Sequence, residues 1–222
     1  AFNYFYQGLE KINIKGCRPS EARFKNYSLA NIIKPHHEIL DIGANCCFLS
    51  ILCAKKAKHI DCIEHNPFLI NIGKITASHL KVKNISFFAN DFLSFKFKKK
   101  YDIVMSFANH NTDDKGSNKN LRTYLEQLHN LLKPKGILLF ESHCGDINNE
   151  NFEKTINALD DIFIMKRNVY FERNLFFACD NRLFYTFEKK RQNSSQKTRN
   201  GPIYWEGKKI DATNEVKTKI SI

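Results

Sequence analysis

The feature that most constrains the fold of this chain is the alternation of short apolar runs with segments of helical periodicity. Five strand-like runs alternate with helical segments, at residues 38–42, 59–64, 84–88, 101–106 and 137–140. Two longer β-like segments follow at about 162–171 and 182–188, close enough to pair antiparallel. Alternation of this kind is typical of a parallel sheet with helices on both faces. We therefore expect a doubly wound α/β fold with seven strands, mostly parallel, in which the last strand is antiparallel.

Helical segments are predicted before, between and after these strands. They are expected at Glu21–Ile33, at Phe48–Ala57, from Asn66-Pro67 to about Leu80, at 121–132 and at Asn151–Leu159. Asn66 and Pro67 are typical of an N-cap and a first helical position. The chain would then comprise an N-terminal helical segment at residues 1–34, an α/β domain at 35–188 and a basic C-terminal appendage of open role at 189–222.

Composition narrows the classes of protein to which this chain can belong. The 222 residues carry a formal net charge of +12, which permits a polyanionic partner. Most of the cations are Lys, which acts more as a solubilising charge than as a phosphate-binding fork, so a generally Lys-rich composition is the favoured explanation. No apolar run approaches the ~20 residues of a membrane span, and the start lacks a signal-peptide pattern, so we expect a cytoplasmic protein. Seven cysteines without a C-x-x-C pair indicate reduced thiols and no metal site.

Polar residues follow each of the five strand-like runs at the point where the strand ends. In an open doubly wound sheet, ligands bind outside the carboxyl ends of the strands. Glu64 follows Asp41 by 23 positions, and in a mononucleotide-binding half an acid at about this interval accepts hydrogen bonds from ribose hydroxyls. The polar groups that we expect at this edge are Asp41–Asn45, Glu64, Asn90–Asp91, Ser106–His110 and Glu141–His143.

Over about residues 35–188 the sequence resembles the class I S-adenosylmethionine-dependent methyltransferases. Leu40–Ser50 is similar to the family's first motif, an acid-x-Gly-x-Gly-x-Gly turn. The second to fifth motifs correspond to Ile63–Pro67, Asn90–Phe92, Tyr101–Ser106 and Leu131–Leu138, and their order and spacing are specific. The resemblance implies a Rossmann-like fold, S-adenosyl-L-methionine as cofactor and methyltransferase activity. An oxidoreductase with a nicotinamide cofactor is the less favoured alternative.

The resemblance also implies roles for individual residues. Gly43 would allow close approach of the cofactor's amino-acid end, Glu64 would accept the ribose hydroxyls, and Asp91 and Phe92 would hold the adenine. The full set of implied cofactor-binding residues is Asp41, Gly43, Asn45, Glu64, Asn66, Asn90, Asp91, Phe92, Ser106 and Arg18. Asn45 and Cys47 stand where the family often has glycine, and a side chain at position 47 would crowd the packing of the helix on the strand.

The segment before the first motif resembles the lid of several methyltransferases. Arg18 or Arg23 could pair with the cofactor's carboxylate through a charge-assisted bond. Alternatively, Pro19-Ser20-Glu21 merely starts a helix, and the sequence leaves both interpretations open. The aromatic residues at positions 4–6 are expected to pack on the sheet rather than line a substrate pocket.

Two histidines fall at the edge where an acceptor would bind. His110 follows the fourth strand and His143 the fifth, so either could act as the base that takes a proton from a hydroxyl acceptor. Glu141 could orient one of them. The alternative is that both are loop histidines bonded to backbone. Asn109 is not followed by the Pro-Pro-aromatic sequence of many amine and base methylators, which favours an oxygen or small-molecule acceptor.

Three functions remain open at this point. The favoured one is a methyltransferase that acts on a small-molecule or sugar-like acceptor, with no membrane span and no required metal. The runner-up is an RNA methyltransferase, supported by the net charge, the basic tail and the Lys96–Lys100 run, although a solvated loop is the favoured interpretation of that run. The third is a non-catalytic relative, for which Cys47 is the only support. The sequence does not determine the oligomeric state.

Overall fold

A computed structural model of the chain describes residues 5–110, 120–171, 181–191, 204–205 and 208–209. It divides into two compact units, residues 1–106 and residues 107–222, and each is described by itself. Among the described residues, no helix is long and apolar enough to cross a membrane.

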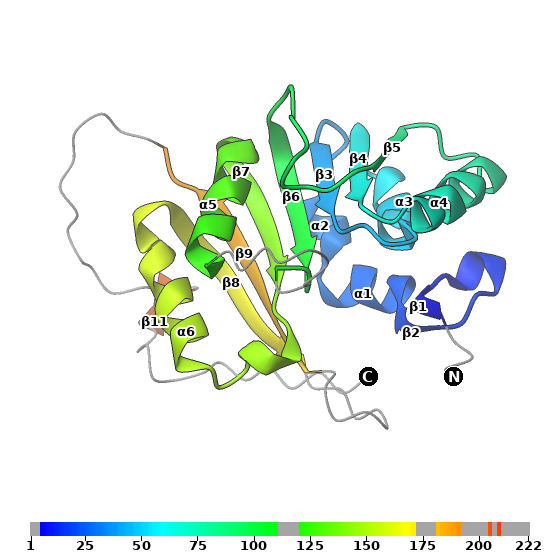
Figure 1. The fold of residues 1–222 in the computed structure, drawn as a ribbon. Helices are drawn as coiled ribbons and strands as arrows, with labels where there is room; N and C mark the ends of the chain where they lie inside the picture. Colours follow the sequence, from blue (N-terminus) through cyan, green and yellow to red (C-terminus); the bar gives the residue numbers. More distant parts are fainter. Residues whose placement is uncertain (1–4, 111–119, 172–180, 192–203, 206–207, 210–222) are drawn as a thin grey trace. The chain divides into compact units, whose positions relative to one another are not determined.

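The strands form the expected seven-stranded, mostly parallel sheet, in the order β5-β4-β3-β6-β7-β9-β8 (Figure 1). The strands β3, β4 and β5 are joined by parallel pairing, as are β3 and β6, whereas β9 is antiparallel to both β7 and β8. The order reverses beside β3, the first strand of the sheet in the sequence, which is the switch point of a doubly wound fold. The strand bounds are β3 Glu38–Ile42, β4 His59–Glu64, β5 Ile85–Ala89, β6 Tyr101–Phe107, β7 Leu132–Glu141, β8 Phe163–Phe171 and β9 Arg182–Lys189.

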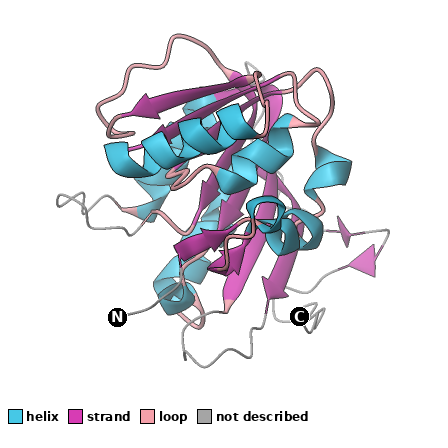
Figure 2. Cartoon of the chain, turned by 90° about the vertical axis from the view of Figure 1, so that its right-hand side faces the viewer, coloured by secondary structure: helices cyan, strands magenta, loops and turns pink. Residues whose placement is uncertain are grey.

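In the first unit, α3 (Phe48–Ala54) packs against β4, and α4 (Pro67–His79) packs against β4 and β5. Figure 2 shows helices lying alongside the strands. The side chain of Asn66 accepts a hydrogen bond from the N–H of Phe68 at 3.0 Å, so the predicted N-cap of α4 is confirmed. The predicted helix at 21–33 is wrong as one element. It forms α1 (Ser20–Asn26) and α2 (Leu29–Ile32), because Ser28 between them has a left-handed backbone with φ 55°.

The N-terminal segment contains two strands that the sequence did not predict. β1 (Phe5–Gly8) and β2 (Gly16–Pro19) pair in parallel, and the short 3-10 helix Glu10–Ile12 lies between them. The prediction that the aromatic residues at 4–6 pack on the sheet is wrong for Phe5 and Tyr6, which are exposed, and Tyr4 lies outside the described residues.

In the second unit, α5 (Leu121–Leu131) contacts α6 (Glu150–Asn157) and β7. The ammonium of Lys189 on β9 donates to the carbonyls of His129 and Leu132, at 2.8 Å and 3.0 Å, and so satisfies the end of α5. In the region predicted as an appendage, β10 (Tyr204–Trp205) and β11 (Lys208–Lys209) pair antiparallel. The remainder of that region after residue 191 lies outside the described residues.

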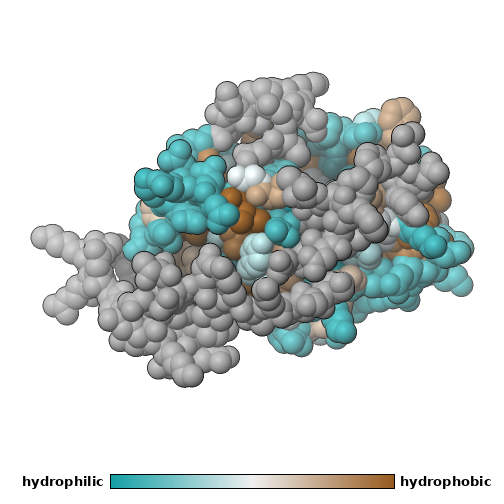
Figure 3. Space-filling view, turned by 90° about the horizontal axis from the view of Figure 1, so that it is seen from below, coloured by the Kyte–Doolittle hydropathy of each residue, from teal (hydrophilic) through white to brown (hydrophobic). Residues whose placement is uncertain are grey.

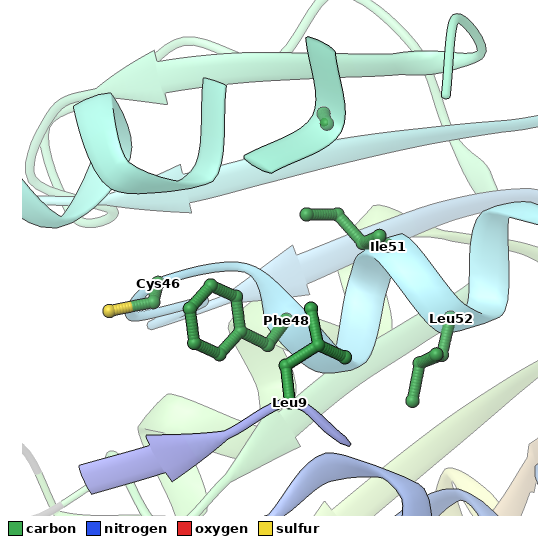
Figure 4. Packing of buried hydrophobic residues seen from close by; sticks show 6 residues of the cluster. Leu9, Cys46, Phe48, Ile51 and Leu52 are labelled. Carbon is green, nitrogen blue, oxygen red and sulfur yellow. The ribbon is translucent and has the colours of Figure 1, made fainter. Parts of the chain in front are cut away.

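Apolar side chains from distant segments form the core of the first unit. Leu9 from the N-terminal segment lies against Phe48 of α3, and Cys46, Ile51 and Leu52 complete the labelled part of this cluster (Figure 4). Outside the core, hydrophilic residues form most of the described part of the face in Figure 3. Burial of Leu9 and Phe48 therefore fixes the N-terminal segment onto the start of α3.

Candidate functional site

The turn between β3 and α3 has an unusual backbone. Gly43, Asn45 and Cys47 have φ values of 65°, 53° and 58°, so every second residue of the turn is left-handed. Glycine adopts this conformation without cost and Asn tolerates it, whereas for Cys it is strained. The turn thus keeps the backbone form of a Gly-x-Gly-x-Gly sequence although only the first position is glycine.

The side chain of Cys47 is accommodated by a glycine on the neighbouring helix. A Cβ atom at Gly73 of α4 would lie 3.0 Å from Cys47 Sγ and 3.1 Å from its Cβ, which is closer than side chains normally pack. The space that a glycine at position 47 would have left is therefore provided by Gly73. This arrangement explains how the chain tolerates Cys47 at a position where the family often has glycine.

Glu64, at the end of β4, connects the two turns at this edge of the sheet. Its Oε2 atom accepts from the Asn45 N–H, and its Oε1 atom accepts from the Asn66 N–H, both at 3.0 Å. His65 Nδ1 lies 2.9 Å from the same Oε1 atom, and only 6% of Glu64 is exposed. A carboxylate has about four acceptor positions, so one position on Oε2 remains for a hydroxyl donor, and the position at the exposed His65 ring could pass to a second.

Asp41 is a buried carboxyl at the end of β3. The Ser50 hydroxyl of α3 donates to its Oδ2 atom. Burial raises the pKa of Asp41 to about 6, and the charge of Glu64 adds to the shift, while the Ser50 hydrogen bond and the charge of Arg23 oppose it. Asp41 therefore ties β3 to α3 and changes charge at a higher pH than an ordinary aspartic acid.

Gln7 of β1 is a residue of this site that sequence reasoning missed. Its Nε2 atom donates to the Ala44 carbonyl at 3.2 Å, and its Oε1 atom accepts from the Phe48 N–H at 3.1 Å. Phe48 is the first residue of α3, and the N-cap residue Cys47 supplies no side-chain cap, so Gln7 satisfies a helix end from a distant segment. No sequence pattern marks a cap supplied across 41 residues.

The other predicted cofactor-binding residues lie near this turn or on the adjoining elements. Arg18 of β2 pairs with Gln7 in register and is buried, with its guanidinium 3.4 Å from the Tyr27 hydroxyl. The Asn90 N–H donates to the Glu64 carbonyl at 3.1 Å, and Ser106 is buried in register with Ile42.

The turn after β5 holds the last two residues of the predicted set. Asp91 is exposed and accepts from the N–H groups of Leu93 and Ser94, and half-buried Phe92 has its ring 5.9 Å from that of Phe97. Backbone and side-chain hydrogen bonds at the ends of β3 and β4 thus connect Gly43, Asn45, Glu64, Asn66 and Asn90, whereas Asp41 is tied to α3 through Ser50. Asp91 and Phe92 belong to the following turn.

The second unit contains a separate group of titratable side chains. His110 has a side chain that is 1% exposed, and its Nε2 atom lies 3.0 Å from Asp146 Oδ2. The His110 ring lies 5.1 Å from the rings of both Phe140 and His143. Asp146 Oδ2 also accepts from the His143 N–H at 2.6 Å. Both predicted catalytic histidines therefore meet at one aspartate.

The partner of the buried histidine differs from the one expected. The Glu141 Oε1 atom lies 3.4 Å from Arg182 Nε, and its charge also acts on His143, where it opposes the lowering of the pKa. Asp146 is the carboxylate beside His110 Nε2, and it was missed because it follows the strand by five residues in a short 3-10 turn, Cys144–Asp146. Asn109 accepts from the Tyr124 hydroxyl at 2.9 Å, so its side chain is used inside the fold.

Burial and charge set the protonation of this group. Burial would raise the pKa of Asp146, but the hydrogen bond and charge of His110, with the His143 N–H, lower it overall. Burial, and then the charge of His110, lower the pKa of His143. Within the described part of the chain, no group of acids, cysteines and histidines has the form of a metal site.

A family model described as a methyltransferase domain matches residues 33–194. The chain belongs to this methyltransferase-domain family. The family cofactor is S-adenosylmethionine, and the turn with three left-handed residues, beside a buried strand-end carboxylate, fits the amino-acid and ribose parts of that group. The prediction of the family and of its cofactor is confirmed, while the domain bounds at 35 and 188 stay a prediction.

Solved structures with this fold come from several organisms. A Listeria monocytogenes protein assigned to the class I S-adenosylmethionine-dependent methyltransferases has a TM-score of 0.65 at 16% identity, over 82% of this chain and 63% of that one. The N-methyltransferase NodS of Bradyrhizobium japonicum, in complex with S-adenosylhomocysteine, has a TM-score of 0.62 at 18% identity, over 78% and 89%. A tRNA methyltransferase of Methanocaldococcus jannaschii has a TM-score of 0.57 at 14% identity, over 79% and 51%. At sequence identities this low, the structural similarity shows a shared fold and does not assign an activity to this chain.

An uncharacterized protein of Methanocaldococcus jannaschii is similar in sequence. It is 29% identical over 85 residues, which are 38% of this chain and 32% of that protein. The chain thus matches about a third of the length of this curated relative, so the match carries no assignment of activity.

Proposed function

We propose that this chain is an active S-adenosylmethionine-dependent methyltransferase that methylates a hydroxyl of a small-molecule or sugar-like acceptor. The observation that carries the proposal is the buried Glu64 carboxylate, which holds the turns at Asn45 and Asn66 and retains acceptor capacity. The proposal includes a cytoplasmic setting, with which the free cysteines among the described residues are compatible.

Residues of the first unit would hold the cofactor. Glu64 would accept the ribose hydroxyls, the Gly43 backbone would face the amino-acid end, and Asp41 would fix the turn through Ser50. Asp91 and Phe92 would meet the adenine, and Arg18 the carboxylate; Asn45, Asn66, Asn90 and Ser106 complete the proposed set. When bound, the cofactor supplies a methyl group activated on a sulfonium, and the protein supplies alignment.

His110 would take the proton of the acceptor hydroxyl. Asp146 lies against Nε2, so it favours the tautomer with the proton on that nitrogen and leaves the Nδ1 lone pair as the base. Both ring nitrogens of His110 are buried and lack a hydrogen bond of good geometry in the described part of the chain, so Asp146, 3.0 Å from Nε2, would act on the ring mainly through its charge. This pairing favours an oxygen acceptor, because a neutral amine needs no base before it attacks.

The test is methyl transfer from labelled cofactor into fractions of a cell extract, followed by variants. His110→Gln should lower kcat about 10²–10⁴-fold on a hydroxyl acceptor and leave the affinity for S-adenosylhomocysteine unchanged. His79→Gln, at an exposed histidine of α4 outside this group, is the control and should retain the full rate. Full activity of His110→Gln, or no label in any small-molecule fraction, would refute the acceptor class.

A second candidate is methylation of RNA. The net charge of +12 favours it, and solved relatives include a tRNA methyltransferase and an rRNA methylase of Streptococcus thermophilus. In the same extract experiment, label that enters the RNA fraction and disappears after ribonuclease treatment would select this candidate over the first.

A further inference from the structure

The amino ends of strands β3 to β6 lie together at one edge of the first unit. The Lys58 N–H donates to the His37 carbonyl at 3.0 Å, and the Asn84 side chain donates to the Ala57 carbonyl at 2.9 Å. The Glu38 N–H donates to Asp102 at 2.8 Å. These bonds join the loops that precede the four strands. We name this set of loops the amino edge, and it consists of residues 34–37, 55–58, 81–84 and 98–100.

The amino edge is rich in exposed lysines. It carries nine of the fourteen lysines in residues 1–106, and its loops contain no acidic residue. All nine are exposed: Lys34, Lys55, Lys56, Lys58, Lys81, Lys83, Lys98, Lys99 and Lys100. Carboxylates outside the loops lie near some of these lysines, and the charge of Glu21 on α1 acts on Lys55. On the strands, Glu38 is 3.4 Å from Lys58, and buried Asp61 is 2.9 Å from Lys99.

The carboxyl ends of β3, β4 and β5 carry no lysine, whereas the stretch after β6, at residues 111–119, contains Lys115 and Lys119 and lies outside the described residues. The turns after β3, β4 and β5, at residues 43–47, 65–66 and 90–94, contain neither Lys nor Arg. A Lys-rich composition alone would distribute lysines over both ends. Their segregation therefore argues against the purely compositional explanation of the net charge.

The positive charges on this side of the unit are crowded. The neighbouring Lys11 side chain is the largest cause of a lowered pKa at Lys55, and burial adds to it. Ammonium groups that repel one another in this way gain free energy when an anion binds between them. The aromatic side chains of Phe95 and Phe97 pack on each other at 4.8 Å, and the intervening Lys96 is exposed. The rings of Phe95 and Phe97 thus pack within the loop before β6, while Lys96 and the lysines at 98–100 are exposed to solvent.

We infer that the amino edge is a docking surface for the phosphate backbone of RNA. Exposed lysines suit sequence-independent phosphate contacts. A membrane surface is disfavoured because none of the exposed large apolar residues lies on these loops, whereas membrane-binding faces combine cations with such side chains. Duplex DNA is disfavoured because no helix or strand ribbon projects from the described loops to enter a major groove. The inference holds for either acceptor class, since docking and methyl transfer use opposite strand ends.

The test measures the affinity of the full chain for a fluorescent RNA hairpin by anisotropy over a range of salt concentrations. Binding should weaken about 10³-fold or more between 50 and 200 mM salt if six or more phosphates are contacted. The fourfold variant with Lys55→Gln, Lys56→Gln, Lys81→Gln and Lys83→Gln should lower the slope of log K against log salt by about three to four. The same four positions changed to Arg should retain the slope.

A matched variant separates local from total charge. Lys15→Gln, Lys25→Gln, Lys74→Gln and Lys154→Gln remove the same charge at exposed positions outside the amino edge, and should leave the slope within about one of the parent. Equal losses in both variants, or none in the first, would overturn the inference. Tighter binding to duplex DNA, or to phosphatidylserine vesicles, than to the hairpin would also overturn it. Cofactor affinity, measured alongside with S-adenosylhomocysteine, should be unchanged, so failure here and failure of the methyltransferase proposal are distinguishable.

Discussion

The two ends of the strands in the first unit are built in opposite ways. At the carboxyl ends, buried Asp41 and Glu64 hold strained turns through hydrogen bonds to defined atoms. At the amino ends, lysines stand exposed on loops and interact mainly through charge. The first kind of site depends on geometry and resists salt, whereas the second depends on total local charge and is screened within about 10 Å at 0.1 M salt. Substitutions at the two ends should therefore differ in what they change.

The largest effect should follow from Glu64→Ala. It removes the acceptor of two backbone N–H groups and the proposed acceptor of the ribose hydroxyls. Since each hydrogen bond to a charged group contributes about 1.5–3 kcal/mol, the affinity for S-adenosylhomocysteine should fall about 10²–10³-fold. Titration calorimetry measures this. Glu38→Ala, an acid at the other end of the sheet, is the control; if both variants bind equally, the comparison of the two ends fails.

Asp41 should make stability depend on pH in a direction opposite to most acids. Its folded pKa of about 6 lies above the ordinary 3.8, so the folded state retains the proton that the unfolded state loses. Stability from this group is present below about pH 4 and is lost as the pH rises to about 6, by about 3 kcal/mol. Asp41→Asn should therefore gain stability relative to the parent between these pH values, as measured by urea unfolding. A constant difference across the range would contradict the burial of this charge.

The contact of Gly73 with Cys47 predicts a pattern that only paired substitutions reveal. Gly73→Ala should destabilise the parent by about 1–3 kcal/mol, because the added methyl meets Cys47 at 3.0 Å. In a Cys47→Gly background the same change should cost less, and the remaining cost would come from the Phe87 ring, which the added methyl meets at 3.1 Å. Thermal or urea unfolding of the four proteins gives the coupling free energy. Additive effects would mean that the two residues do not share one space.

Gln7 should have a smaller effect on stability, because it contributes two ordinary hydrogen bonds. Gln7→Ala removes the bonds to Ala44 and Phe48 and should cost about 1–2 kcal/mol. The affinity for the cofactor should fall as well, because the turn between β3 and α3 loses the hydrogen bonds that Gln7 makes to it. Gln7→Glu keeps the acceptor for the Phe48 N–H, so it should retain more of the stability and more of the cofactor affinity. An unchanged unfolding midpoint for Gln7→Ala would show that α3 does not need this cap.

Local signals account for what the sequence predicted. The strand-end acids, the Asn66 N-cap and the terminal antiparallel strands each follow from residues close together in the chain, and the structure has all of them. The prediction of one helix at 21–33 was wrong because the chain breaks at Ser28, and no Gly or Pro in the sequence marks that break.

Long-range contacts account for what the sequence missed. Gln7 caps α3 from 41 residues away, and Gly73 makes room for Cys47 from another helix, so neither has a pattern within one segment. Asp146 was missed as a neighbour of His110 because a short 3-10 turn after β7 brings it back to the histidine, and periodicity does not predict such a turn. The roles proposed for the site residues toward cofactor and acceptor stay predictions.

The smallest effect should come from the amino edge. Lys58 lies 3.4 Å from Glu38, but its side chain is 62% exposed, and exposed ion pairs contribute about 0–1 kcal/mol. Lys58→Ala should change the free energy of unfolding by less than about 0.5 kcal/mol, measured by urea unfolding, and should leave cofactor affinity unchanged. A loss comparable to that of Gly73→Ala would show that the lysines hold the fold together. In that case the lysines of the amino edge would have a structural role instead of forming a docking surface. The two ends of the strands would then differ in position but not in the kind of interaction they make.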